Sequence, residues 1–235
     1  MIEFATPQFW AAALEIVVIN ILLSGDNAVV IALACRNLPA RQRILGIFWG
    51  VIGAVVLRII LTFFATRLLT MPWLQLIGAV LLLWIGVKLI AEEEGGEPNV
   101  AASDRLLAAV KTVIVADLVM SLDNVIGVAA AAKGSLLLLI FGLAVSIPLV
   151  VAGSQIIMKL IARVPLLVQA GGGLLGWIAG EIATTDVVVK PWIDATAPDL
   201  HWIAPVAGAG FVIVGGWLLA RQRRHGRRHA HRHKA

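Results

Sequence analysis

Residues 23–30 read LSGDNAVV, and residues 120–127 read MSLDNVIG. Each stretch lies inside a long apolar run, and a shift of 97 residues places the Ser and the Asp-Asn pair of the first stretch on those of the second. An ionised carboxylate inside a bilayer is costly unless it is paired or hydrated, so acids within membrane spans mark transport pathways or binding sites. The two matched pairs therefore predict a functional site inside a membrane-spanning fold.

The composition of the chain requires lipid around it. Of the 235 residues, 60% are hydrophobic and 14% are charged, and the mean hydropathy is +0.94. A soluble domain carries about 25% charged residues. The first seven residues hold an acid and no base, unlike a secretory signal peptide, so we expect the first apolar run to be a retained span. The single cysteine, Cys35, excludes an internal disulfide and is expected to be structural.

Seven apolar runs are long enough to cross a bilayer, which takes about 20 residues. The predicted spans are 9–35, 43–67, 71–91, 106–132, 136–160, 164–183 and 202–220. Residues 92–105 are predicted to be an acidic linker, and residues 184–201, with several Asp and Pro, a loop. We therefore expect an all-α polytopic membrane protein with about seven transmembrane helices.

The two halves of the chain match each other beyond the Asp-Asn motifs. A shift of 93 residues aligns the third predicted span with the sixth, and the aligned pairs include Pro72 with Pro165, Gly78 with Gly171 and Trp84 with Trp177. Two three-span repeats follow, at 1–91 and 106–183, with the span 202–220 added. Because three is odd, the second repeat enters the membrane from the opposite side. Inverted repeats of this kind are common in transporters whose substrate binds near the midplane.

Basic residues concentrate at one set of span ends. That set holds fifteen Lys and Arg, and the opposite set holds three. The larger set is Arg36, Arg41, Arg43, Lys88, Arg105, Lys111, Lys159, Arg163 and the seven bases of the tail, and the smaller is Arg67, Lys133 and Lys190. Cytoplasmic loops carry the excess of bases. We therefore expect a multi-pass protein of the bacterial inner membrane, with the N-terminus outside, residues 92–105 and the C-terminus in the cytoplasm, and residues 184–201 outside the cytoplasm.

Polar residues of the first and fourth spans form the candidate site. At 100° per residue, Asn20, Ser24 and Asn27 lie along one stripe, and Asp117, Ser121 and Asn124 lie along another. Carboxylate, amide and hydroxyl oxygens without thiols suit hard divalent cations such as Mg²⁺, Ca²⁺ and Mn²⁺. The predicted metal ligands are Asp26, Asn27, Asp117, Asp123 and Asn124, with Asn20, Ser24 and Ser121 as candidate accessory ligands.

Three further ionisable residues are candidate accessories. Glu15 returns to nearly the same helix face as Asp26. Arg58 lies in the middle of the second span, where it either pairs with a site carboxylate or makes a purely structural ion pair. Glu181 lies near the outer end of the sixth span and is either a vestibule ligand or part of a solvated helix end.

The tail 221–235 holds seven of the nineteen Lys and Arg, four of the five His and no acid. The rest of the chain carries 12 bases and 14 acids, so the net charge of +5 does not predict nucleic-acid binding. We expect a disordered cytoplasmic tail that lies against anionic lipid. A His-rich arm that captures metal is the alternative.

These motifs resemble those of the TerC family of integral membrane proteins, in its YjbE- and YkoY-like branch within the larger group of lysine-exporter-like transporters. The resemblance covers about residues 7–220 and is carried by SGDNAVVI at 24–31, DLVMSLDN at 117–124 and GWIAGE at 176–181. It implies a transporter fold and manganese export, with intramembrane acids as metal ligands. Older naming ties the family to tellurite resistance. The basic tail lies outside the pattern.

The leading hypothesis is a secondary transporter that exports a divalent cation, above all Mn²⁺, with carboxylates that exchange metal for protons. The sequence leaves Mg²⁺, Ca²⁺ and Fe²⁺ open as substrates, and also the coupling ion and a homo-oligomeric state. No nucleotide-binding G-x-x-x-x-G-K-[ST] motif is present, and we expect neither a cofactor nor an enzyme. The alternatives are a membrane scaffold of a metal- or tellurite-stress complex and an exporter of a small organic solute.

Overall fold

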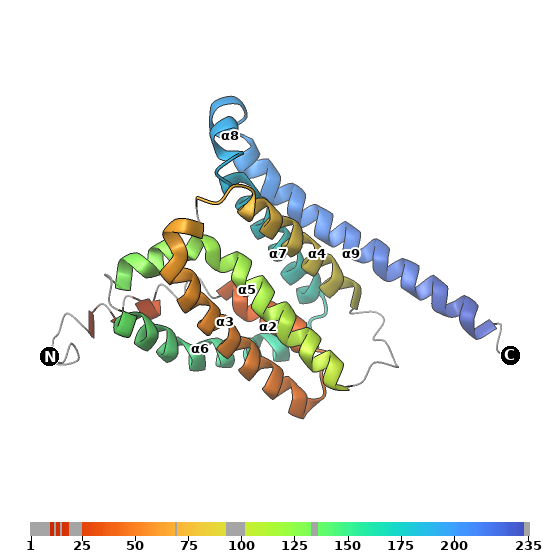
Figure 1. Cartoon of the computed structure of the whole chain (residues 1–235). Helices are drawn as coiled ribbons and strands as arrows, with labels where there is room; N and C mark the ends of the chain where they lie inside the picture. Colours follow the sequence, from red (N-terminus) through yellow and green to blue (C-terminus); the bar gives the residue numbers. More distant parts are fainter. Residues whose placement is uncertain are drawn as a thin grey trace. The chain divides into compact units, whose positions relative to one another are not determined.

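The computed structural model describes residues 10–11, 13–14, 16–18, 25–68, 70–92, 102–132 and 136–232, without the side chains of 65–66, 102, 123–132, 136, 138–139 and 223–232. Throughout these residues the regular elements are helices, which confirms the all-α prediction (Figure 1). The helices are α2 (Gly25–Cys35), α3 (Ala40–Leu68), α4 (Leu74–Ala91), α5 (Ala102–Ala132), α6 (Leu136–Arg163), α7 (Leu166–Thr185), α8 (Lys190–Thr196) and α9 (Leu200–Arg232).

Five of the seven predicted spans coincide with helices that are long and apolar enough to cross a membrane. These helices are Ala40–Phe64, Leu74–Ala91, Ile140–Arg163, Leu166–Thr185 and Leu200–Gln222. The first predicted span contains the shorter apolar helix α2, and the fourth lies within the continuous 31-residue helix α5. The total of seven spans and the inverted repeat stay predictions, and most of the linker 92–105 lies outside the described residues.

The chain forms two compact units that do not follow the order of the sequence. Residues 1–71 and 106–159 make the first unit, which contains α2, α3, α5 and most of α6. Residues 72–105 and 160–235 make the second, which contains α4, α7, α8 and α9. Each unit therefore combines equivalent spans of the two predicted repeats, for example the third span with the sixth in the second unit.

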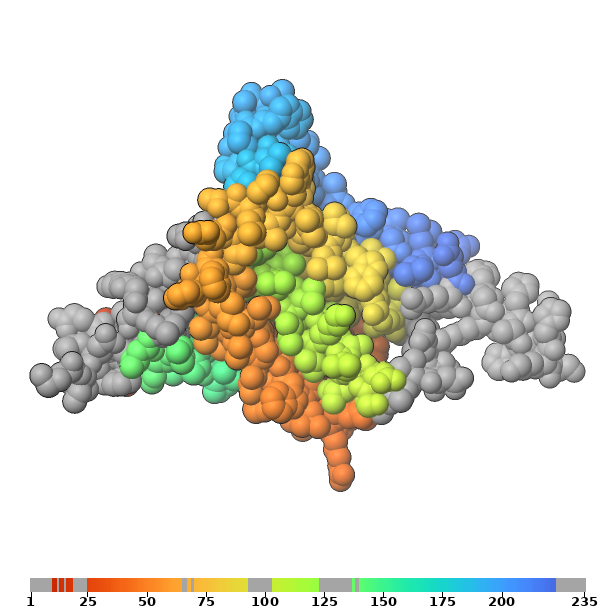
Figure 2. All heavy atoms as spheres, viewed as in Figure 1, coloured from red at the N-terminus to blue at the C-terminus, as the bar shows by residue number. Residues whose placement is uncertain are grey.

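In the first unit, α3 packs against α5 through glycines. A Cβ on Gly50 would meet Val113 at 3.0 Å, and one on Gly53 would meet Ile114 at 2.5 Å. The two glycines lie about one turn apart and let the valine and isoleucine of α5 approach the α3 backbone. Figure 2 shows the side chains of α3 and α5 as adjoining surfaces. This close packing brings Arg58, five residues further along α3, against α5.

In the second unit, α7 lies beside both α4 and α9 (Figure 1). Gly172, Gly176 and Gly180 are spaced four residues apart on α7, so they share one face of the helix. A Cβ on Gly176 would strike the backbone of Gly208 in α9, and one on Gly180 would strike that of Ala204. Small residues at such spacing let helix backbones meet in a membrane, where close van der Waals packing replaces the hydrophobic effect as the source of association.

Asp186, at the end of α7, caps the start of α4. Its side chain is fully buried, and its carboxylate accepts hydrogen bonds from the backbone N–H groups of Val188 (3.0 Å), Trp73 (3.3 Å) and Leu76 (3.3 Å). Leu76 lies in the first turn of α4, where N–H groups have no partner within the helix. Trp73 precedes α4 with a φ of 67°, a strained left-handed conformation for a residue other than glycine. The predicted loop 184–201 thus contains a structural cap, followed by the short helix α8.

The expectation of a disordered tail is wrong as far as Arg232. Helix α9 continues from the seventh predicted span through residues 221–232 without a break. This stretch contains no proline and one glycine, and Arg, Gln and Ala readily extend a helix that the span has already nucleated. The guanidinium of Arg221 lies 5.5 Å from the ring centroid of Trp217, one turn earlier. The tail therefore begins as an extension of the span.

Candidate functional site

A cavity lies among α2, α3, α5 and α6 of the first unit. Its empty volume is about 420 Å³, which includes space open to the surroundings. The lining consists of four polar residues, Asn27, Arg58, Asp117 and Ser146, and eight apolar residues, Val30, Ile31, Val51, Ala54, Val55, Val113, Ile147 and Val150. The cavity thus contains two of the five predicted ligands, Asn27 and Asp117, together with one predicted accessory, Arg58.

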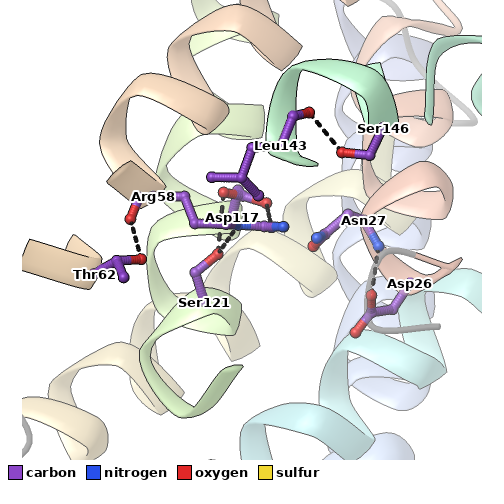
Figure 3. A network of polar contacts seen from close by, with 8 residues as sticks. All are labelled: Asp26, Asn27, Arg58, Thr62, Asp117, Ser121, Leu143 and Ser146. Carbon is purple, nitrogen blue, oxygen red and sulfur yellow. Dashed lines mark hydrogen bonds and ion pairs between the residues drawn. The ribbon is translucent and has the colours of Figure 1, made fainter. Parts of the chain in front are cut away.

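A buried ion pair forms one polar side of this cavity (Figure 3). Nη2 of Arg58 lies 2.5 Å from Oδ1 of Asp117, and the two residues are only 4% and 6% exposed. Nε of Arg58 donates to Oγ of Ser121 at 3.1 Å, and that hydroxyl donates to Oδ2 of Asp117, also at 3.1 Å. Asp117 and Ser121 are therefore neighbours one turn apart, as the predicted stripe on this helix requires. Arg58 thus forms an ion pair with Asp117, one of the predicted ligands.

The side-chain amide of Asn27 is buried in the cavity wall. The residue is 5% exposed, and within the part of the chain that the structure describes neither Nδ2 nor Oδ1 has a hydrogen-bond partner. A buried polar group left unpaired costs about 1–3 kcal/mol, so such groups are rare and call for an explanation, such as a partner that binds there. Figure 3 shows Asn27 between Asp26 and the Arg58–Asp117 pair. The amide is thus placed to contact a molecule or ion inside the cavity.

Asp26 stands at the start of α2, next to Asn27. It is half-buried, and its Oδ1 accepts the backbone N–H of Asn27 at 2.7 Å. Figure 3 shows Asp26 on the side of Asn27 that faces away from the Arg58–Asp117 pair. Asp26 therefore adjoins the cavity residue Asn27.

The contribution of α6 was missed in the sequence. Ser146 is buried in the cavity wall, and its hydroxyl donates to the carbonyl of Leu143 at 2.6 Å. Pro148, two residues later, lacks the N–H that would otherwise donate to the carbonyl of Ala144. Broken hydrogen bonding of this kind is tolerated in a membrane helix where it is buried in protein or lines a cavity. The Ser-Ile-Pro sequence within an otherwise apolar span was the available signal.

The other predicted site residues are not part of the described lining of this cavity. Glu181 lies on α7 in the second unit, where it is exposed. Glu15, Asn20 and Ser24 lie outside the described residues. Asp123 and Asn124 are part of α5, but their side chains are also outside the description. Among the described residues no three His, Cys, Asp or Glu side chains form a cluster that could hold a metal ion.

Comparisons with known proteins identify the family. The sequence profile described as "Integral membrane protein TerC family" matches residues 5–225. The membrane protein YjbE of Bacillus subtilis (strain 168) is 41% identical over 207 residues, which cover 88% of this chain and 94% of YjbE.

More distant relatives are also membrane proteins by name. YceF of the same organism is 28% identical over 75% of this chain and 72% of its own length. The inner membrane protein YgdQ of Escherichia coli (strain K12) is 28% identical over 51% of this chain and 58% of its own length. No solved structure matches the chain. The family profile and the similarity to YjbE both extend over most of the sequence, and the chain therefore belongs to the TerC family of integral membrane proteins.

Proposed function

We propose that this protein is a secondary transporter that exports a divalent metal cation, with Mn²⁺ as its substrate. The observation that carries the proposal is the buried amide of Asn27, which has no hydrogen-bond partner among the described residues and faces a cavity beside Asp117. An amide oxygen and carboxylate oxygens are ligands that hard divalent cations accept. The metal is the cargo here, and the proposal involves neither a cofactor nor an enzymatic reaction.

The proposed site combines residues of α2 and α5. Asn27 and Asp117 provide an amide and a carboxylate in the cavity, and Asp26 adds a second carboxylate beside Asn27. Asp123 and Asn124 of α5 would complete the ligand set. Carboxylates that exchange the metal for protons would couple export to the proton gradient.

Transport assays in proteoliposomes test this function. We expect Mn²⁺ to enter vesicles that contain the purified protein, as read from the quenching of a trapped metal-sensitive dye. Asp26→Asn removes a charge while it keeps the size of the side chain, and we expect it to lower the Mn²⁺ affinity about tenfold or more, because cation binding depends on the charge of the ligands. Asp104→Asn is the matched control, since Asp104 is an exposed acid in the first turn of α5.

Two results would contradict the proposal. One is the absence of transport for Mn²⁺, Mg²⁺, Ca²⁺ and Fe²⁺ alike in a correctly folded preparation. The other is transport by Asp26→Asn and Asp117→Asn at the rate of the unchanged protein, because the intramembrane carboxylates would then be structural. The relative rates across the four ions decide which of them is the substrate.

A small organic solute is the second candidate, and one observation favours it. Eight of the twelve residues around the cavity are apolar, and the polar side contains a buried guanidinium, Arg58, beside a carboxylate, Asp117. Apolar walls with a few convergent polar groups are typical of small-molecule sites, and a zwitterion could pair with both charges. Uptake of radiolabelled amino acids into the same vesicles, without any response to metals, would favour this candidate over Mn²⁺.

A further inference from the structure

Arg58 is a buried cation inside a site proposed for cations. It lines the same cavity as Asn27 and Asp117 and is 4% exposed. A positive charge at this place opposes the entry of a metal ion by Coulomb repulsion. Its burial also costs free energy, which only a well-formed ion pair offsets. The arginine must therefore serve the site when no metal is bound.

The hydrogen bonds of the ion pair engage both oxygens of the Asp117 carboxylate. Oδ1 contacts Nη2 of Arg58, and Oδ2 accepts the hydroxyl of Ser121, which is itself held by Nε of Arg58. The guanidinium thus acts on one oxygen directly and on the other through Ser121. A cation that binds Asp117 therefore competes with the guanidinium for the charge of this carboxylate.

We propose that Arg58 is a tethered counter-ion that takes the place of the transported cation on Asp117 whenever the site is empty. The inference rests on the proposed function and adds to it the way in which the empty site is stabilised. Entry of the cation displaces the guanidinium from Asp117, and departure of the cation restores the pair. The Asp117 carboxylate therefore never stands unpaired in the low dielectric of the membrane, where an isolated charge is costly.

This arrangement favours net export over exchange. Net export requires the empty carrier to change its access from one side of the membrane to the other, whereas exchange of one ion for another uses only the loaded carrier. With Arg58 present, the empty carrier changes access with a neutral pair. Without it, the empty carrier would have to do so with a buried, unpaired carboxylate, so we expect the return step to become slow.

The test separates binding, exchange and net transport in the purified full-length protein. We expect Arg58→Gln to bind Mn²⁺ about tenfold more tightly than the unchanged protein, because the competing charge is gone. Exchange of radiolabelled Mn²⁺ across proteoliposomes should persist, while net Mn²⁺ transport falls about tenfold or more. Arg58→Lys keeps a cation and should restore part of the net transport. The control is Arg67→Gln, which removes an exposed arginine at the end of the same helix.

Two results would show that Arg58 only positions Asp117: weaker Mn²⁺ binding by Arg58→Gln, or an equal loss of exchange and net transport. Either result would overturn this inference and leave the proposed function standing. Absence of binding and transport of Mn²⁺, Mg²⁺, Ca²⁺ and Fe²⁺ alike in the unchanged protein would overturn the proposed function as well. If Arg58→Gln does not insert, Asp117→Asn is compared with the double variant Arg58→Gln/Asp117→Asn, in which no charge of the pair remains buried. The double variant must bind Mn²⁺ more tightly than Asp117→Asn, and equal or weaker binding overturns the inference.

Discussion

At the scale of single residues, two buried polar side chains differ in whether they are hydrogen-bonded. Asp186 is fully buried and satisfied, because three backbone N–H groups donate to its carboxylate. Asn27 is buried and unsatisfied, because no residue that the structure describes forms a hydrogen bond with either atom of its amide. Hydrogen-bonded burial stabilises a fold, whereas unpaired burial weakens it and is retained where function requires it. Opposite effects on stability should follow when each residue is replaced.

Asn27→Leu should stabilise the protein and stop transport. Leucine has a similar size and carries no polar atom to bury, so the unfolding free energy should rise by about 1–2 kcal/mol. Mn²⁺ transport should be lost together with the amide ligand. The measurements are thermal unfolding in detergent and dye quenching in proteoliposomes.

Gln75→Leu is the matched control for this prediction. Gln75 is also a buried amide, but it has an interaction partner, so its replacement should not stabilise the protein. A less stable Asn27→Leu protein would mean that the amide has a structural role and is not held ready for a ligand.

Asp186→Ala should destabilise the protein by about 3 kcal/mol or more, since it leaves three backbone donors without their acceptor. The effect should concentrate at the start of α4, where Trp73 and Leu76 donate. Hydrogen exchange of residues 73–76 would then accelerate relative to the rest of α4. Asp194→Ala is the control, because Asp194 is an exposed acid whose bonds to Lys190 and His201 contribute little to stability. Equal stability of the two variants would exclude the capping role of Asp186.

At the scale of helices, glycine decides how closely the elements approach. Gly176 and Gly208 bring the backbones of α7 and α9 into contact, and Gly50 and Gly53 admit the side chains of Val113 and Ile114 on α5 to the α3 backbone. The second effect matters for the site, since the Arg58–Asp117 pair joins α3 to α5 close to these contacts. Helix propensity alone disfavours these glycines, and packing in the membrane explains them.

Gly208→Ala should weaken the packing of α7 against α9, while Gly210→Ala should not. A Cβ on Gly208 would collide with the backbone of Gly176, whereas nothing lies within 4 Å of one on Gly210. Because the collision is with backbone, we expect Gly208→Ala to cost about 2 kcal/mol or more in unfolding free energy. Both glycines lie on α9, so replacement by alanine raises the helix propensity equally in the two variants. The difference between their thermal unfolding temperatures therefore measures the contact between Gly208 and Gly176. Equal stability of the two variants would mean that α9 moves away without cost.

At the scale of the whole molecule, the charge bias still determines the expected orientation. Six of the seven bases of the tail lie on the part of α9 that continues directly from the last span. Eight further Lys and Arg residues lie at the other span ends that are predicted to face the cytoplasm. Both groups favour a cytoplasmic C-terminus. We therefore expect the orientation not to depend on the tail.

Truncation after Ala220 should leave the topology unchanged. In a Cys35→Ala background, Ser103→Cys should react with an impermeant thiol reagent only in opened cells, and Ala195→Cys should react in intact cells. Both positions are exposed in the structure. The same pattern is expected with and without the tail. Labelling of Ser103→Cys in intact cells would reverse the orientation and remove the basis for an inverted repeat.

The sequence by itself determined the family, the helical membrane class and five spans, because hydropathy over about 20 residues and the Asp-Asn motifs are local properties of the chain. It also placed Asp117 and Ser121 on one helix face, because helical periodicity is local too. The tertiary structure decided three things: that Arg58 pairs with Asp117, that Ser146 joins the cavity, and that Asp186 caps a helix more than a hundred residues away. These contacts depend on which helices become neighbours, and packing between distant segments settles that.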